Sequence, residues 1–312
     1  IRAILRGREL RKQLSFLEAP RSADGRLRAS FNVGATETGR WSSSRNAFNE
    51  GLNYQNVYKK LRYIFVPDPG LKMGQSDLEQ AESHVVAMLS GDPGYIEAHK
   101  SFDTHTYVCK LVWPDLDWPN DEGPQDVALA SEPNFIRHFS RRDLSKRVQH
   151  GTNYGASEYV LSQILQISRA DAKDVQDRYL KAFPGIKNWQ DRIKLELRRY
   201  GWLATPLGRR RQFFDRVWES TTQREAISFV PQGTVGDILN VGLYRVWRDL
   251  DGRVLWLLNQ GHDSILYQFD PAHEKSVIEA VEERLKVRFE IEGREVCIGV
   301  DSGTGENWLA TG

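Results

Sequence analysis

Two apolar, strand-forming stretches flank a polar segment in VLWLLNQGHDSILYQF, residues 254–269. Gly261 provides a turn between the two stretches, so the pattern predicts a β-hairpin. The tip of this hairpin carries an imidazole and a carboxylate, His262 and Asp263. Asp and Ser also favour turns for conformational reasons alone. This segment by itself therefore supports either ordinary turn chemistry or a functional pair.

A second carboxylate stands at the predicted end of a strand, in SDLEQAESH, residues 76–84. Asp77 lies where that strand ends and a helix, predicted over about 79–89, begins. Glu82 falls within the first turns of the helix. A carboxylate at a strand end can bind a hard cation such as Mg²⁺. The alternative is that the acidic residues only favour the helix N-terminus.

Four side chains recur every four residues in RRDLSKRVQHGTNYG, residues 141–155: Arg142, Lys146, His150 and Tyr154. On a helix this spacing forms one gently spiralling stripe. The two cations suit phosphates, and the two rings suit a base and a sugar. Gly151 and Gly155 would let a flat group approach closely. A solvated basic helix is the alternative.

Together the three segments suggest one kind of chemistry. If a sheet places the two strand ends side by side, Asp77 and Asp263 meet, and their repulsion is costly unless a cation lies between them. Two carboxylates with a cationic helix are the constellation for metal-assisted phosphoryl transfer.

The elements that must position these residues follow a simple order. Strands are predicted near both ends of the chain, before 76, over 254–269 and over 296–300. The middle is predicted to be helical, with one helix from Ser168 to Phe183, a second ending at Gly201, and a later one over 272–288. This order predicts an α+β fold interrupted by a helical subdomain.

Composition narrows the class of protein. The 312 residues are 40% hydrophobic and 27% charged, as in a globular chain, and no apolar run could span a bilayer. The two cysteines, Cys109 and Cys297, match no metal-binding spacing and predict a reducing compartment, hence the cytoplasm of a bacterium or of a virus-infected cell. The N-terminus has no signal-peptide pattern and no initiator Met, which suggests a fragment.

Charge is uneven although the net charge is only +1. Residues 1–28 hold eight Arg or Lys against three acids, residues 137–147 hold five against one, and GRRR at 208–211 forms a third cluster. Such clusters suggest a polyanionic partner or, equally, a solvated basic surface.

The order of the three segments resembles motifs A, B and C of family A DNA polymerases, the bacterial polymerase I and phage-type group. The resemblance covers roughly residues 26–308. Further matching segments are TGRWSS (38–43), NYQN (53–56), FPGIKNW (183–189), TPLGRRR (205–211) and REAISFVPQGTVGDIL (224–239). Several ordered and spaced matches make chance resemblance a poor explanation.

The resemblance implies a right-hand polymerase palm, an antiparallel sheet with packed helices, and an inserted helical fingers subdomain. We expect the palm in residues 1–91 and 223–312 and the fingers in residues 92–222. Thumb and exonuclease domains are expected to be absent or truncated, and a longer protein could supply them or other replication modules.

The resemblance also assigns roles. Asp77 and Asp263 would be the catalytic ligands of two Mg²⁺ ions, with Mn²⁺ able to substitute, and Lys146 would assist catalysis. The expected nucleotide-binding residues are Gln80, Glu82, Arg142, Lys146, His150 and Tyr154, with Glu82 as a steric gate against the ribose hydroxyl. The expected primer–template contacts are Arg40, Asn53, Gln55, Arg224, Gln232 and His262. DNA primer–template and deoxynucleotides are the implied partners, with no membrane.

The implied function is template-directed DNA polymerisation in DNA replication. Three residues depart from the family pattern: His150 replaces Phe or Tyr, His84 replaces Arg, and Ser264 replaces Glu. Ser264 resembles the single-subunit RNA polymerases, which supply one alternative, and a non-catalytic nucleic-acid-binding remnant is another. Those RNA polymerases carry a small residue where this chain has Glu82, so Glu82 favours the DNA polymerase.

Overall fold

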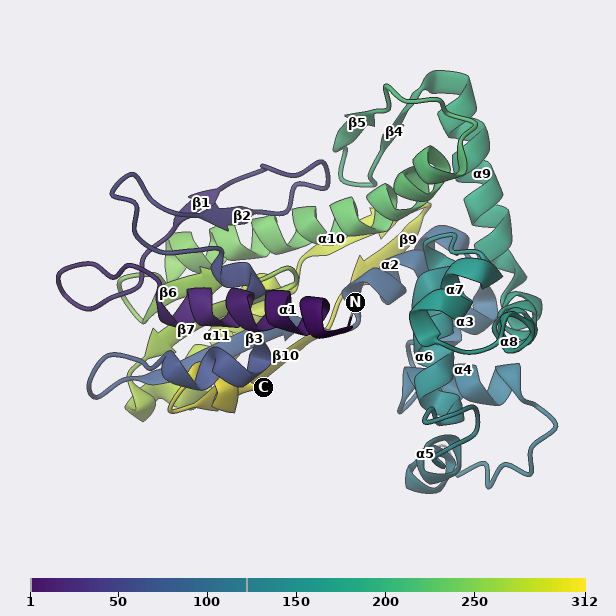
Figure 1. Ribbon diagram of the computed structural model, residues 1–312, viewed down its shortest axis with the longest axis horizontal. Helices are drawn as coiled ribbons and strands as arrows, with labels where there is room; N and C mark the ends of the chain where they lie inside the picture. Colours follow the sequence, from purple (N-terminus) through teal and green to yellow (C-terminus); the bar gives the residue numbers. More distant parts are fainter. Residues whose placement is uncertain (1, 122) are drawn as a thin grey trace. The chain divides into compact units, whose positions relative to one another are not determined.

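The computed structural model describes residues 2–121 and 123–312, which form two compact units (Figure 1). The sheet unit comprises the chain up to Ala81, Val235–Arg288 and Cys297–Gly312. The helical unit comprises Glu82–Thr234 and Phe289–Val296. The predicted α+β class, with helices inserted between strand-bearing ends, is confirmed.

The sheet unit contains a four-stranded antiparallel sheet in the order β10-β3-β7-β6. Its strands are β3 (Lys72–Leu78), β6 (Leu255–Gln260), β7 (Ser264–Phe269) and β10 (Val300–Gly305). Strands β6 and β7 are the predicted hairpin. The strand predicted over 296–300 is instead the junction between β9 (Arg294–Cys297) and β10. Strand β10 is rich in Gly, Ser and Thr, so its pairing with β3, more than its own β-propensity, makes it a strand.

The two faces of the sheet are covered differently. On one face the ring of Tyr267 fills the space beside Gly74, where a Cβ atom would lie only 2.5 Å from that ring. The helix α11 (Glu274–Leu285) contacts β3 and β10. A core cluster joins β3 and β7 to α1 (Arg2–Leu17), η1 (Tyr54–Asn56) with the residue that follows it, and η4 (Trp308–Thr311). Its members are Phe16, Tyr54, Val57, Met73, Leu266 and Trp308.

The long helix α10 (Ser220–Asp249) continues through Pro231, and the boundary between the units falls within it. In the sheet unit, a Cβ on Gly242 would lie 2.9 Å from Leu285 of α11, so α10 and α11 pack closely. Gly236 lies against the carbonyl of Thr38, and Asn240 donates a hydrogen bond to the carbonyl of Gly39 at 3.1 Å. These contacts fix the chain just before Arg40 beside α10.

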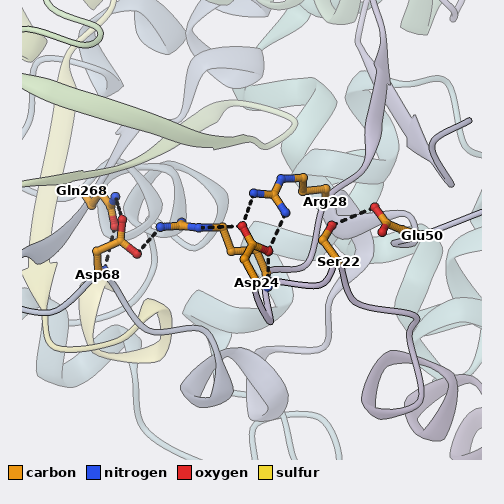
Figure 2. Close-up of polar contacts among 7 residues, drawn as sticks. Ser22, Asp24, Arg28, Glu50, Asp68 and Gln268 are labelled. Carbon is orange, nitrogen blue, oxygen red and sulfur yellow. Dashed lines mark hydrogen bonds and ion pairs between the residues drawn. The ribbon is translucent and has the colours of Figure 1, made fainter. Parts of the chain in front are cut away.

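An ionic network holds the N-terminal loop to the sheet (Figure 2). Arg26 donates to Asp68 at 2.6 Å, and Gln268 donates to the same carboxylate at 2.8 Å. Arg28 pairs with Asp24 and, through its hydrogen bonds, holds the pKa of that carboxyl well below its usual range. Two arginines of the N-terminal basic cluster are thus neutralised within the protein, which favours a structural role for them.

The rest of the sheet unit adds β1 (Ser30–Asn32), β2 (Ser42–Ser44), η2 (Lys59–Ile64) and η3 (Pro271–His273). Strands β1 and β2 pair as a small antiparallel sheet. Helix α1 is a structural finding that the basic composition of residues 1–28 did not predict.

Several helices of the helical unit begin with a side-chain cap. Its elements are α2 (Ala81–Ser90), α3 (Pro93–Ala98), α4 (Thr104–Val112), α5 (Pro124–Ala130), α6 (Arg141–Asn153), α7 (Glu158–Leu165), α8 (Arg169–Ala182), α9 (Pro184–Tyr200), β4 (Trp202–Ala204), β5 (Arg210–Gln212), β8 (Arg288–Ile291) and β9. Ser168 caps α8 by accepting from the Asp171 amide, and Gly201 ends α9 with φ of 70°. Both predicted helix boundaries are confirmed.

Both cysteines are free thiols, Cys109 buried and Cys297 exposed, and burial raises the pKa of Cys109 to about 12. Among the described residues, no helix combines the length and the apolar character needed to cross a membrane.

Candidate active site

The sheet brings Asp77 and Asp263 side by side. Strands β3 and β7 run antiparallel, with Asp77 opposite Ser264, so the last residues of β3 lie beside the first residues of β7. The amide of Leu78 donates to the carbonyl of Asp263 at 2.9 Å, which ties the two strand ends together. The two residues, far apart in the sequence, therefore lie at neighbouring strand ends, with Asp77 in β3 and Asp263 directly before β7.

This juxtaposition changes the acidity of Asp77. Burial and the negative charge of Asp263 raise its pKa, while hydrogen bonds from Gln75 and Ser264 and the charge of Arg62 oppose the rise. When a carboxyl with a raised pKa lies beside a second carboxylate, a cation bound between them would reduce their electrostatic repulsion.

A hollow of about 130 Å³ opens beside the two carboxylates. Four of the predicted site residues line it: Gln55, Asp77, His262 and Asp263. Ser264, one of the departures from the family pattern, lines it too. Gln55 is held by a hydrogen bond of 2.9 Å to the Gln260 side-chain oxygen.

Among the other residues that line this hollow, Arg62, Gln75 and Trp308 form a set of contacts that the sequence did not predict. Gln75 donates to Oδ2 of Asp77 at 2.7 Å and accepts from Nε1 of Trp308, also at 2.7 Å. The guanidinium of Arg62 stacks 4.6 Å from the Trp308 ring centroid. Gln75 could have been found, because it lies two residues before Asp77 and so on the same face of the strand. Arg62 and Trp308 carry no such local signal.

The donor set fits a divalent cation that is shared with a substrate. Within residues 2–121 and 123–312 no group of three or more His, Cys, Asp or Glu side chains could hold a metal. Two carboxylates alone are too few for a structural metal site, but Mg²⁺ often binds through one or two carboxylates together with water and substrate phosphates. Asp77 and Asp263 therefore match the oxygen ligands of such an ion.

In the helical unit, α6 carries the predicted cationic stripe. The Ser140 side chain caps this helix by accepting from the Asp143 amide. Leu144 and Val148 are buried on one face, whereas Lys146 and His150 are exposed on the other. Tyr154 is the C-terminal cap and lies just beyond the helix, so the stripe is one residue shorter than expected. Its ring still meets His150 at right angles, with centroids 4.9 Å apart.

Arg142 has a partner that the sequence did not reveal. Its Nε and Nη2 atoms donate to the two carboxylate oxygens of Asp103, at 2.8 and 2.6 Å. Asp103 also caps α4 by accepting from the Thr106 amide at 2.8 Å. Burial alone would raise the pKa of Asp103, but the hydrogen bonds from Arg142 and Thr106 outweigh it and hold that pKa well below its usual range.

Glu82 and Tyr154 meet in the helical unit. The Tyr154 hydroxyl donates a hydrogen bond to the Glu82 carboxylate, although the two residues come from α2 and from the end of α6. Two residues that were predicted to contact one nucleotide are thus in direct contact. Gln80 is exposed in the turn between β3 and α2 and adopts a left-handed conformation, with φ of 45°.

A groove of about 360 Å³ brings together three more predicted residues, Tyr154, Arg224 and Gln232. Gly155 lies beside Arg224 and has φ of 72°, a conformation that favours glycine. Gly151 does not serve the close approach of a ligand, because a Cβ there would lie 2.5 Å from the side chain of Leu161. It allows α6 and α7 to pack, which corrects the expectation.

The remaining predicted residues lie elsewhere. In the sheet unit, Asn53 accepts a hydrogen bond from Ser43 at 3.2 Å and Arg40 adjoins α10; neither lines the hollow beside Asp77. His84 does not supply the positive charge that an arginine would carry at this position, because burial lowers its pKa. Its ring stacks on His99, with centroids 5.0 Å apart.

Comparison with known proteins identifies the family. The family model described as "DNA polymerase family A" matches residues 1–310. The chain is 29% identical over 329 residues to "DNA polymerase I, thermostable" of Thermus thermophilus, covering 99% of this chain and 36% of the relative. It is 28% identical over 298 residues to "DNA polymerase I" of Mycobacterium tuberculosis, covering 93% of this chain and 31% of the relative.

A solved structure is also similar. The "POL domain of Pol1 from M. smegmatis complex with DNA primer-template and dNTP" superposes with a TM-score of 0.78 at 26% identity. The match covers 95% of this chain and 50% of that one. The chain spans about a third of the length of the two curated relatives named above. Because the family model extends over nearly all of it, and the adjacent carboxylates and the motif-bearing helix are in place, the chain belongs to DNA polymerase family A.

Proposed function

We propose that the chain is a template-directed DNA polymerase that adds deoxynucleotides to a primer 3′-hydroxyl and releases pyrophosphate. The observation that carries this proposal is the position of Asp77 and Asp263 at two adjacent strand ends, with the pKa of Asp77 raised by burial and by Asp263. Such a pair is suited to metal-assisted displacement at phosphorus. We assign the palm role to residues 1–91 and 223–312 and the fingers role to residues 92–222.

Asp77 and Asp263 would hold two Mg²⁺ ions, or Mn²⁺ in their place. Bound there, the ions supply Lewis-acid stabilisation of the attacking hydroxyl and of the leaving pyrophosphate. The protein's own part is orientation: Gln75 holds one oxygen of Asp77, and Trp308 holds Gln75. His262 and Gln55, on the same hollow, position the primer end and the template strand.

The nucleotide is bound by the exposed face of α6. Lys146 contacts the triphosphate and donates a proton to the departing pyrophosphate. Arg142, one turn earlier on α6, binds the same phosphates when its guanidinium is released from Asp103 or is shared between Asp103 and the phosphates. The rings of His150 and Tyr154 are suited to the sugar and the base, and Gln80 contributes from the turn before α2.

Glu82 excludes ribonucleotides by occupying the space that a 2′-hydroxyl would need. An attractive pocket discriminates weakly against one added hydroxyl, by about a hundredfold, whereas a deliberate clash discriminates strongly. The hydrogen bond from Tyr154 supports this role, because it holds the Glu82 carboxylate in one orientation.

Primer–template DNA is the second substrate. Arg224 and Gln232 border the groove next to Tyr154 and are placed to contact the duplex, and Arg40 and Asn53 add contacts from the sheet unit. The structurally similar mycobacterial polymerase domain was solved with DNA primer-template and dNTP, which supports this choice of partner.

Primer extension tests the proposal. Deoxy- and ribonucleotides are compared on DNA and on RNA templates in the presence of Mg²⁺. Extension with deoxynucleotides on DNA is the expected result. Equal use of both sugars would favour an RNA polymerase. Tight duplex binding without extension would favour a non-catalytic nucleic-acid-binding protein.

A further inference from the structure

A buried polar cluster in the helical unit is centred on one atom, the hydroxyl oxygen of Tyr95. This residue of α3 is fully buried, against the ring of Phe183 at 5.2 Å. Its hydroxyl lies 2.7 Å from Oγ of Ser83 on α2, 2.6 Å from Nε2 of Gln149 and 2.9 Å from Nδ2 of Asn153, both on α6. One phenol therefore binds two helices at once.

The protons of this cluster can be assigned from its chemistry. The amide nitrogens of Gln149 and Asn153 can only donate, so they occupy both acceptor positions of the Tyr95 hydroxyl. The Tyr95 proton must then go to Ser83, which also accepts from Gln149 at 3.0 Å. Ser83 in turn donates to Nε2 of His99 at 3.0 Å.

This direction of donation requires a neutral His99 with its proton on Nδ1. A protonated imidazole would turn Nε2 into a donor and leave the Ser83 proton without an acceptor. Burial and the neighbouring His84 lower the pKa of His99 to about 3, in agreement with that requirement. At neutral pH the cluster is therefore connected from Gln149 and Asn153 through Tyr95 and Ser83 to His99, and connected networks of this kind hold one geometry.

The cluster borders the pair that the proposed function uses for sugar selection. Ser83 directly follows Glu82 on α2, and Asn153 directly precedes Tyr154 at the end of α6. Each partner of the Glu82–Tyr154 hydrogen bond is thus the chain neighbour of a residue that binds Tyr95.

We propose that Tyr95 is a positioning residue for sugar discrimination: its hydroxyl fixes α2 against α6 and thereby fixes the Glu82 carboxylate against Tyr154. The proposal rests on the proposed role of Glu82 as a steric gate. Without the hydroxyl, Ser83 and Asn153 lose their common partner, and Glu82 gains freedom to move aside for a ribose.

A double-mutant cycle tests the proposal. The variants are Tyr95→Phe, Glu82→Ala and the double variant. The measured quantity is the ratio of kcat/KM for a deoxynucleotide to that for the matching ribonucleotide. Tyr95→Phe should lower this ratio by roughly tenfold, as expected for residues coupled through one network. In the Glu82→Ala background the same change should have no further effect on the ratio.

Tyr267→Phe is the matched control. Tyr267 is as buried as Tyr95, and its hydroxyl lies 3.1 Å from Oγ of Ser76. It belongs to β7 of the sheet unit, so its variant should lower the melting temperature about as much and leave the sugar ratio unchanged. Ser83→Ala removes the α2 contact from the other side. It should reproduce the effect of Tyr95→Phe even if that variant folds poorly.

The outcomes distinguish a failure of the steric-gate role of Glu82 from a failure of the positioning role of Tyr95. If Glu82→Ala leaves the sugar ratio unchanged, the steric gate itself is wrong and the role of Tyr95 fails with it. If Glu82→Ala changes the ratio while Tyr95→Phe and Ser83→Ala do not, only the positioning role is overturned. An equal loss for both sugars, or the same loss in Tyr267→Phe, would reduce Tyr95 to a structural residue.

Discussion

Arg142 and Asp103 form a two-point ion pair between α6 and the N-terminal cap of α4, with donor–acceptor distances of 2.8 and 2.6 Å. The arginine proposed to bind a triphosphate is therefore already neutralised within the helical unit. A phosphate must compete with Asp103 for the guanidinium, so Asp103 is expected to weaken nucleotide binding while it stabilises the fold.

We therefore expect Asp103→Asn to lower the apparent KM for deoxynucleotides by about two- to fivefold, because half or more of a kcal/mol of competing interaction is removed. Asn is also a good helix cap, so α4 should keep its N-terminus. The melting temperature should fall, since the charge-assisted bonds are lost. Asp174→Asn, which removes an exposed pair with Arg178 within α8, is the control and should change neither quantity appreciably. An unchanged KM in Asp103→Asn would exclude Arg142 from triphosphate binding.

The two strand-end carboxylates lead to a combined prediction on activity and stability. Asp77→Asn and Asp263→Asn should each abolish extension and leave duplex binding nearly intact. Because the folded-state pKa of Asp77 is raised, its contribution to stability is lost as pH rises through that pKa. At neutral pH without divalent metal, Asp77→Asn should accordingly raise the melting temperature, by roughly 2–4 °C.

Mg²⁺ titration of the melting temperature completes this test. Mg²⁺ should stabilise the wild type, because a ligand that binds only the folded state raises its stability. It should stabilise neither variant. Near-normal extension by either variant would remove that residue from the catalytic centre.

Glu82→Ala should increase ribonucleotide insertion by tenfold or more, in the range expected when a repulsive contact is removed. Tyr154→Phe removes only the hydroxyl that orients Glu82 and should have a smaller effect in the same direction. Single-nucleotide insertion kinetics with both sugars measure the two changes. Unaltered sugar preference in both variants would rule out the gate.

Lys146 and the groove residues should fail in different ways. Lys146→Ala is expected to raise the nucleotide KM and to slow extension by about a hundredfold, the scale of losing a general acid or an electrostatic contact. Arg224→Ala should instead weaken duplex binding. It should also reduce the slope of log K against log salt concentration by about one, because one phosphate contact is lost. Gln232→Ala should weaken duplex binding without changing the salt dependence, since Gln carries no charge. A common defect in all three would contradict this division of roles.

The neutral His99 predicts acid sensitivity. Its pKa falls from 6.5 to about 3 on folding, so the unfolded chain binds a proton that the folded chain does not. The resulting stability is complete above pH 6.5 and is lost as pH falls toward 3. Burial also lowers the pKa of His84, and that of His105 to about 4, so both add to the effect. Between pH 7.5 and 5 the melting temperature should fall less in His99→Gln than in the wild type, since Gln keeps an acceptor for Ser83 but does not titrate. An equal fall in both proteins would exclude His99 as a source of the acid sensitivity.

Several local elements of this protein follow from the sequence alone. The hairpin at 254–269, the cap at Ser168 and the stop at Gly201 were all predictable. Each depends on interactions within a few residues: alternation of apolar side chains, a hydroxyl that accepts from a nearby amide, and a glycine that tolerates a positive φ. The candidate carboxylates and the cationic stripe were recognisable because their spacing matches a strand end and a helix.

The partners of those residues were decided only by the tertiary structure. Trp308 reaches Asp77 through Gln75, Asp103 neutralises Arg142, and Tyr95 joins α2 to α6. These contacts join segments that are distant along the chain, and nothing in the spacing of either segment specifies the other. Strand β10 likewise forms because β3 offers an edge for pairing. Local propensities determine most of the elements, whereas long-range packing and hydrogen bonding determine which side chains meet and, for β10, whether a strand forms at all.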